Sequence, residues 1–225
     1  MKILAFDCAG ASCSAAVIED GTVLARRLEA MDRGQAEVMI PMIASVLAEA
    51  HLTPMALDLI AVTTGPGGFT GVRIGLAAAR GLALATGVPA IGVDCFAAVA
   101  AATIVPPGRT LVVALESKRA ELYLRISAPD IGPPLLVAPD SWNAWVPSGP
   151  VLLAGDGAAR LAAALAGRDL VVAAGTGLVD AADVARVAAS LWQAGTRPAP
   201  APLYLRPPDT TPAAPRPGIV PAQPL

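Results

Sequence analysis

The chain has 225 residues, of which 55% are hydrophobic and only 4% aromatic, and its formal net charge is −2 with a pI near 5.4. This length suits one large domain or two small ones, and this charge excludes the basic footprint of a protein that holds nucleic acid by itself. The single histidine, His51, excludes a histidine-rich metal site and any serine–histidine–aspartate triad that does not use it.

The first 105 residues predict a three-stranded meander followed by alternating helices and strands. Short apolar runs indicate the strands, and Glu19-Asp20-Gly21 indicates a hairpin turn, because Asp-Gly tolerates the positive φ that such turns need. Pro41 indicates either a kink in the first helix or its true first turn. The expected strands cover residues 3–6, 14–18, 22–28, 59–62 and 90–93, and the expected helices cover residues 35–50, 70–86 and 96–102.

The segment Pro106-Pro107-Gly108 predicts a domain boundary, which gives an N-terminal lobe of residues 1–105 and a C-terminal lobe of residues 106–205. The alternating pattern after an antiparallel meander predicts an α/β protein with mixed sheets flanked by helices. Ten prolines among residues 198–225 predict an extended or disordered tail over residues 206–225. The second lobe is expected to hold strands at 111–115, 121–126, 151–153 and 170–173, and helices at 158–165 and 180–193.

Two features predict the compartment. The cysteines Cys8, Cys13 and Cys95 lack paired spacing, which favours buried thiols in a reducing environment over a disulfide framework. Asp7 interrupts the first apolar run too early for a secretory signal peptide, and no stretch long enough to cross a bilayer lacks charge or proline. We therefore expect a soluble cytoplasmic protein without a membrane segment.

A glycine-rich loop lies between the expected strand 59–62 and the expected helix 70–86, which is a context for binding an anion at a helix N-terminus. The alternative is that its glycines only permit a tight turn and close packing. The loop is not a Walker A motif because no Gly-Lys-Ser/Thr occurs, and it departs from a dinucleotide fingerprint because its third glycine comes one place late. The glycines are Gly65, Gly67, Gly68 and Gly71.

Asp7 ends the first strand, where a carboxylate could position a metal-bound nucleotide. Ser12 in the following turn could bind phosphate or only cap the turn, and no basic residue lies in this turn. Asp156 in Gly-Asp-Gly indicates a helix N-cap or a turn. The candidate nucleotide-binding residues are Asp7, Ser12, Gly65, Gly67, Gly68 and Thr70.

The two long helices of the first lobe predict a docking surface. Apolar residues cover more than half of the circumference of the first helix, which indicates that it is covered from more than one direction. In the second helix Gly71, Gly75 and Ala79 recur every four residues and leave one face nearly bare. The second covering surface is expected to be another domain or another chain.

Several motifs together resemble the TsaB (YeaZ) family, over most of residues 1–209. The resemblance implies an actin-like (ASKHA) two-lobed fold. It also implies a non-catalytic subunit that supports its paralogue TsaD in forming N6-threonylcarbamoyladenosine next to the tRNA anticodon. The motifs are ILAFD (3–7), VTTGPGGFTGVRIGLAAARGLALATGVPAIGVD (62–94), RAELY (119–123), LAGDGA (153–158) and LYLRPPD (203–209).

The resemblance also implies the partners and the interface. TsaD and TsaE are the expected partners, a homodimer is expected without TsaD, and tRNA is contacted only indirectly. The resemblance implies that this chain requires no cofactor of its own, although ATP or ADP with Mg could bind in the complex. Gln35 stands where the family often has histidine, which puts in doubt any role for an ionisable group there. The expected interface residues are Gln35, Val38, Met39, Met42, Ile43, Val46, Gly71, Arg73, Gly75, Ala78, Ala79 and Leu82.

Two other classes of function stay open at this point. One is an actin-like ATPase or small-molecule kinase that uses Asp7 and the glycine loop. The other is an enzyme that uses a nicotinamide cofactor.

Overall fold

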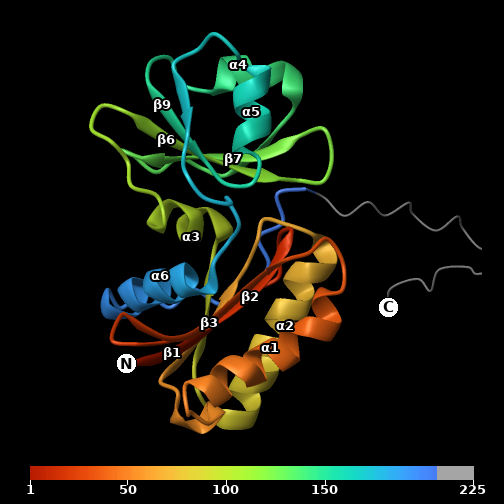
Figure 1. The fold of residues 1–225 in the computed structure, drawn as a ribbon, viewed down its shortest axis with the longest axis vertical. Coiled ribbons are helices and arrows are strands. Elements are labelled where there is room, and N and C mark those ends of the chain that lie inside the picture. Colours follow the sequence, from red (N-terminus) through yellow and green to blue (C-terminus); the bar gives the residue numbers. More distant parts are fainter. Residues whose placement is uncertain (207–225) are drawn as a thin grey trace, which may run out of the picture.

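The computed structural model describes residues 1–206, which form two lobes, each built around a five-stranded sheet (Figure 1). In the first sheet, with strand order β3-β2-β1-β4-β5, β1 pairs antiparallel with β2 and parallel with β4. The predicted Asp20-Gly21 hairpin turn is confirmed, since both residues have positive φ. The strands are β1 (Lys2–Asp7), β2 (Ser12–Glu19), β3 (Thr22–Ala30), β4 (Leu59–Thr63) and β5 (Ala90–Val93).

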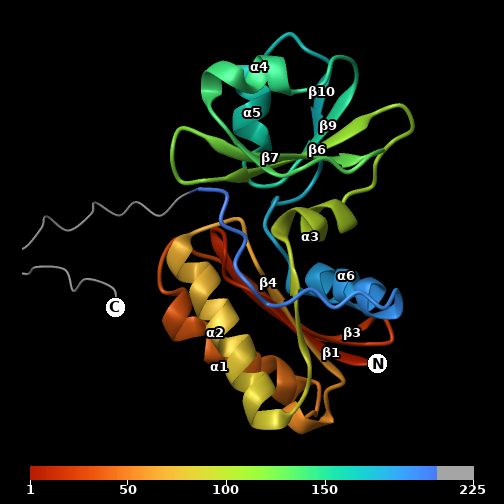
Figure 2. The same ribbon diagram turned by 180° about the vertical axis from the view of Figure 1, so that it is seen from behind.

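Helices cover both faces of the first sheet. Helices α1 (Gln35–Glu49) and α2 (Phe69–Thr86) lie side by side on one face, and α6 (Ala181–Gln193) packs against β1 and β2 on the other face (Figure 2). Because β1 is enclosed between these layers, its residues from Ile3 to Phe6 are fully buried. Helix α1 begins at Gln35 and continues through Pro41, so Pro41 does not mark its first turn.

The second sheet has the strand order β10-β9-β6-β7-β8 and its own smaller core, which includes Leu124, Trp142 and Leu161. Helix α3 (Cys95–Ala101) lies between the two lobes and contacts α6, β6 and β7 (Figure 1). The elements of this lobe are β6 (Thr110–Glu116), β7 (Leu122–Ala128), β8 (Leu135–Val137), α4 (Trp142–Trp145), β9 (Val151–Ala154), α5 (Ala158–Ala164) and β10 (Leu170–Val172). Two short 3-10 helices, η1 (Pro54–Ala56) and η2 (Pro139–Ser141), complete the described elements.

The boundary expected near residue 106 lies between the two sheets, but α6 follows the second sheet in the chain and packs on the first. The first lobe therefore draws on both halves of the chain, whereas the sequence placed residues 180–193 in the second lobe. The prediction for the tail concerns residues 206–225, and all of these except Arg206 lie outside the described residues. Among residues 1–206, no helix has the length and hydropathy that a bilayer crossing requires.

Candidate functional site

The glycine-rich loop packs against the β1–β2 turn of the same chain. A Cβ atom on Gly71 would meet the carbonyl oxygen of Cys8 far inside the 3.0 Å at which real contacts stop, and one on Gly67 would meet the carbonyl oxygen of Ala9 in the same way. The Gly68 amide donates a hydrogen bond to that Ala9 oxygen at 2.7 Å. These glycines therefore permit two backbone segments of this chain to approach closely, as one of the two sequence interpretations proposed.

Asp7 lies at the end of β1 and is fully buried. Its Oδ1 accepts hydrogen bonds from Thr63 Oγ1 at 2.5 Å and from the Ala9 amide at 3.1 Å, while its Oδ2 has no hydrogen-bond partner among the described residues. Burial raises the pKa of this carboxyl to about 6, although the Thr63 hydrogen bond acts in the opposite direction. Asp7 thus holds a proton more tightly than an exposed aspartate does.

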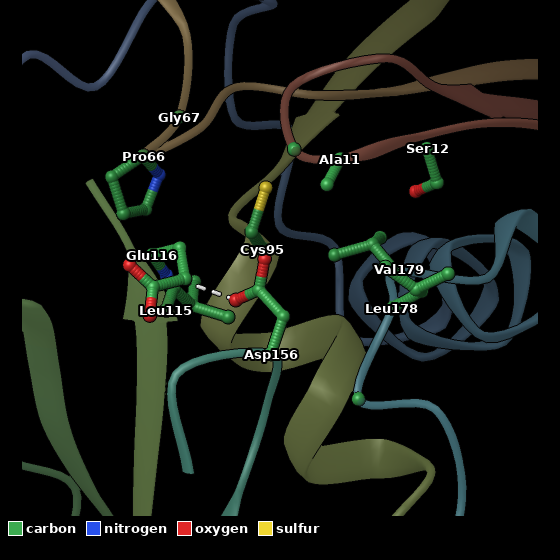
Figure 3. A pocket seen from close by; sticks show the side chains of 12 residues that line it. Ala11, Ser12, Pro66, Gly67, Cys95, Leu115, Glu116, Asp156, Leu178 and Val179 are labelled. Carbon is green, nitrogen blue, oxygen red and sulfur yellow. Dashed lines mark hydrogen bonds between the residues drawn. The ribbon is translucent and has the colours of Figure 1, made fainter. Parts of the chain in front are cut away.

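A small cavity of about 20 Å³ lies between residues of the two lobes (Figure 3). Its volume suits a single water molecule. Ser12 Oγ lines it from the first lobe and is buried without a hydrogen-bond partner among the described residues. Asp156 projects into the cavity from the second lobe (Figure 3), accepts a hydrogen bond from the Glu116 amide at 2.9 Å, and has its pKa raised by burial. Asp156 therefore does not cap α5, whose N-cap residue is Gly157.

A larger cleft of about 260 Å³ opens next to this cavity. Its charged side chains are Asp32, Glu116, Asp156 and Lys118, and the Lys118 Nζ lies 3.9 Å from Asp32 Oδ1. A nucleoside triphosphate in this cleft would meet three carboxylates and a single ammonium group, that of Lys118, which is already paired with Asp32. In the described part of the chain, no group of three or more metal-ligating side chains occurs. These residues do not fit a tight triphosphate site, and nucleotide binding stays a prediction.

The six candidate nucleotide residues do not all come together. Ser12 and Gly67 line the small cavity, and Gly68 lines the larger cleft. Gly65 lines neither space, since a Cβ atom added to it would meet Val72 Cγ2 at 3.3 Å and the Leu203 carbonyl oxygen at 3.5 Å, and Thr70 is exposed on α2. The sequence missed the wall that Glu116 and Lys118 form, because a charged hairpin between two strands is usually only solvated surface.

Half of the expected interface belongs to the chain's own core, which corrects the prediction. Because α1 packs on β2 and β3, its four buried interface residues, from Met39 to Val46, are at most 4% exposed. Gly75 is buried as well, and a Cβ atom added to it would lie 3.3 Å from Val62 Cγ2. The buried residues are Met39, Met42, Ile43, Val46, Gly75 and Ala79. Of the others, Arg73 is exposed, whereas Gln35, Val38, Gly71, Ala78 and Leu82 are half-buried.

The same two helices also carry exposed apolar and small residues, among exposed charged residues such as Glu37 and Arg80. Leu84 is 89% exposed and Ile40 is 55% exposed, and the exposed residues around them on the two helices are mostly small. We call this surface the outer helix face and define it by Ile40, Ala44, Ala48, Ala77, Gly81, Leu84 and Ala85. Met55, which is 77% exposed, lies in η1 beside α2.

The chain matches known proteins by sequence and by structure. A family model described as TsaD, tRNA N6-adenosine threonylcarbamoyltransferase, matches residues 27–127. The tRNA threonylcarbamoyladenosine biosynthesis protein TsaB of Escherichia coli is 37% identical over 124 residues, which span 55% of this chain and 53% of that protein. Protein Mb3455c of Mycobacterium bovis is 36% identical over 94% of this chain and 95% of its own length. The solved structure of YeaZ from Pseudomonas aeruginosa superimposes with a TM-score of 0.77 at 26% identity, covering 91% of this chain and 99% of that one.

The chain belongs to the TsaB (YeaZ) family. This membership confirms the resemblance that the motifs indicated. The fold prediction is confirmed too, since the two mixed sheets with their helices form an actin-like (ASKHA) fold. The ethanolamine utilization protein EutJ of Carboxydothermus hydrogenoformans, at 14% identity and a TM-score of 0.53, shares the fold alone.

Proposed function

We propose that this TsaB-family chain is a non-catalytic subunit that binds TsaD through the outer helix face and supports it in modifying tRNA. The observation that carries the proposal is that α1 and α2 still present an exposed apolar surface after the sheet has covered their inner stripe. Leu84 at 89% exposure and Ile40 at 55% lie on this surface. Apolar side chains that a monomer leaves in water gain about 25 cal/mol per Å² when a partner covers them, before the costs of association.

The comparison with TsaD supports this choice of partner. The matching TsaD model covers residues 27–127, which include both α1 and α2. A TsaD chain is therefore expected to carry a related pair of helices. Two related surfaces can pair with each other much as two copies of one surface do in a symmetric dimer. The small residues Ala44, Ala77 and Gly81 would let the paired helices approach closely. Without TsaD, the same face would pair two copies of this chain.

The charge of the chain supports an indirect role toward RNA. Because the chain has a net charge of −2 and three carboxylates lie around the interlobe cleft, this cleft does not attract the phosphates of RNA. Binding of tRNA is therefore assigned to TsaD. TsaE is a further proposed partner.

The test is an affinity measurement by calorimetry between this chain and TsaD of the same organism. Leu84→Asp and Ile40→Asp place a charge in the interface, and we expect each to weaken binding by at least about tenfold. Ile131→Asp is the matched control, since Ile131 is 75% exposed in the second lobe. Wild-type affinity in both helix variants, with unchanged circular dichroism, would refute the proposed surface.

The ATPase alternative is tested on the isolated chain. Calorimetry with ATP and Mg, followed by a phosphate-release assay, separates the two functions. Tight binding with turnover would favour the ATPase, whereas the scaffold role predicts no turnover by this chain alone.

A further inference from the structure

The segment that follows α6, residues 198–206, returns along the first lobe toward the second (Figure 2). We call it the strap. Its backbone is held at two places: the Gly92 amide donates to the Pro198 carbonyl oxygen at 2.9 Å, and the Leu203 amide donates to the Thr64 carbonyl oxygen at 2.8 Å. The strap is thereby attached to β5 and to the residue that follows β4.

The first lobe is shaped to receive the strap. A Cβ atom on Gly92 would lie 2.7 Å from the Ala199 carbonyl oxygen, closer than real side chains come. A glycine at this position is therefore required for the strap to pass. Arg80, on α2, donates from Nη2 to the Pro200 carbonyl oxygen at 2.7 Å. The strap thus contacts both the edge of the sheet and the helix that carries part of the outer helix face.

One end of the strap is joined to the start of α2 by a stacked cluster. The Arg73 guanidinium lies 3.6 Å from the centre of the Phe69 ring, and its Nε donates to the Tyr204 hydroxyl at 2.9 Å. The Phe69 and Tyr204 rings stack with centres 5.5 Å apart. Phe69 and Tyr204 are both close to half exposed, at 45% and 43%. A displacement of the first turn of α2 therefore also displaces Tyr204.

Two residues further on, the strap reaches the second lobe. The Arg206 guanidinium forms an ion pair with Glu121 at 2.8 Å, and the Arg206 side chain is only 19% exposed. Glu121 stands immediately before β7, at the end of the turn that joins β6 to β7 and contains Lys118. This turn also forms part of the wall of the interlobe cleft.

We propose that the strap is a brace that fixes the β6–β7 turn of the second lobe to the start of α2 in the first. A protein that docks on α2 would then tighten the interlobe cleft without touching the second lobe. The brace itself needs no partner, whereas its response to docking rests on the proposed function. The brace has two successive links, from Phe69 and Arg73 to Tyr204 and from Arg206 to Glu121, and the backbone of residues 204–206 joins them.

Hydrogen exchange measured by mass spectrometry on the isolated chain tests the brace. Arg206→Gln and Tyr204→Ala should each speed exchange of amides 116–123 by about three- to fivefold, the range expected for losing one partly exposed ion pair or ring contact. Exchange in β1 should not change. Arg197→Gln is the charge-matched control, because Arg197 stacks on Trp192 and precedes the strap. Unchanged exchange of amides 116–123 in both strap variants would overturn the proposal.

A second arm measures the response to docking. Added TsaD should slow exchange of amides 116–123 in the wild type but not in Arg206→Gln, although both bind. Equal slowing in the two proteins would overturn the coupling. If TsaD binds neither protein, the proposed function fails, and the first arm still decides whether the brace exists.

Discussion

Two glycines of helix α2 should respond to the same substitution with opposite signs. In Gly71→Ala the new methyl group would run into the carbonyl oxygen of Cys8, a backbone atom that cannot rotate away. Overpacking costs about 1–3 kcal/mol, and a clash with backbone belongs at the upper end. Alanine returns about 1 kcal/mol through its higher helix propensity. The net loss is about 2 kcal/mol, or about 4–8 °C in Tm for a chain of this size.

Gly81→Ala is the matched control, because the space around Gly81 is open and the residue is exposed. There the propensity gain is uncompensated, so Tm should rise by about 2–4 °C. Thermal unfolding followed by circular dichroism at 222 nm measures both variants under one set of conditions. A Gly71→Ala protein as stable as the wild type would refute the account of the glycine loop as a close approach between backbones.

Two further predictions concern buried groups. Met39→Ala should lower the free energy of unfolding by about 2–5 kcal/mol, whereas Leu84→Ala should change it by less than about 0.5 kcal/mol; equal effects in urea unfolding would contradict the assignment of Met39 to the core. Burial raises the pKa of Asp7 from 3.8 to about 6, so between these pH values the folded chain keeps a proton that the unfolded chain has released, and stability falls as pH rises. In Asp7→Asn, up to about 3 kcal/mol of this pH-dependent loss of stability should be absent. Stability profiles of the two proteins that run parallel from pH 4 to 7 would contradict this role of Asp7.

The long elements could be predicted from the sequence because their periodicity is strong. The helix expected over residues 35–50 is found at Gln35–Glu49, and the one expected over residues 70–86 is found at Phe69–Thr86. Strand β8 and helix α4 were missed, because elements of three and four residues are too short to show a period. Pro133 and Pro134 lie directly before β8, and prolines there disfavour a regular strand pattern.

The surface of the helices was harder to predict than their position. Periodicity gives the angle of each apolar residue around the axis, but it does not say which covering layer belongs to the same chain. The stripe through Met39 and Val46 is the most apolar part of α1, and for that reason it is buried against the sheet. The residues that stay outside, Ile40 and Ala44, are spaced as regularly as Met39 and Ile43, so spacing alone does not tell which row the sheet covers.

The site was predictable where it depends on strand ends. Asp7 follows a buried strand, and glycines follow the neighbouring strand, so parallel pairing of β1 with β4 brings them to one edge. Asp156 lies more than a hundred residues away in the chain. Its position opposite Ser12 depends on how the two lobes face each other, and no local pattern carries that information.

The return of helix α6 to the first sheet has a consequence for how this protein is made. Five of its residues, from Ala181 to Ala188, are buried. Without them, one apolar face of β1 and β2 would be exposed to water. When a ribosome has synthesised the chain only as far as residue 106, helix α6, which covers this face of the first lobe, has not yet been made. A fragment cut at that point is expected to aggregate, and the two halves cannot be swapped between relatives as independent modules.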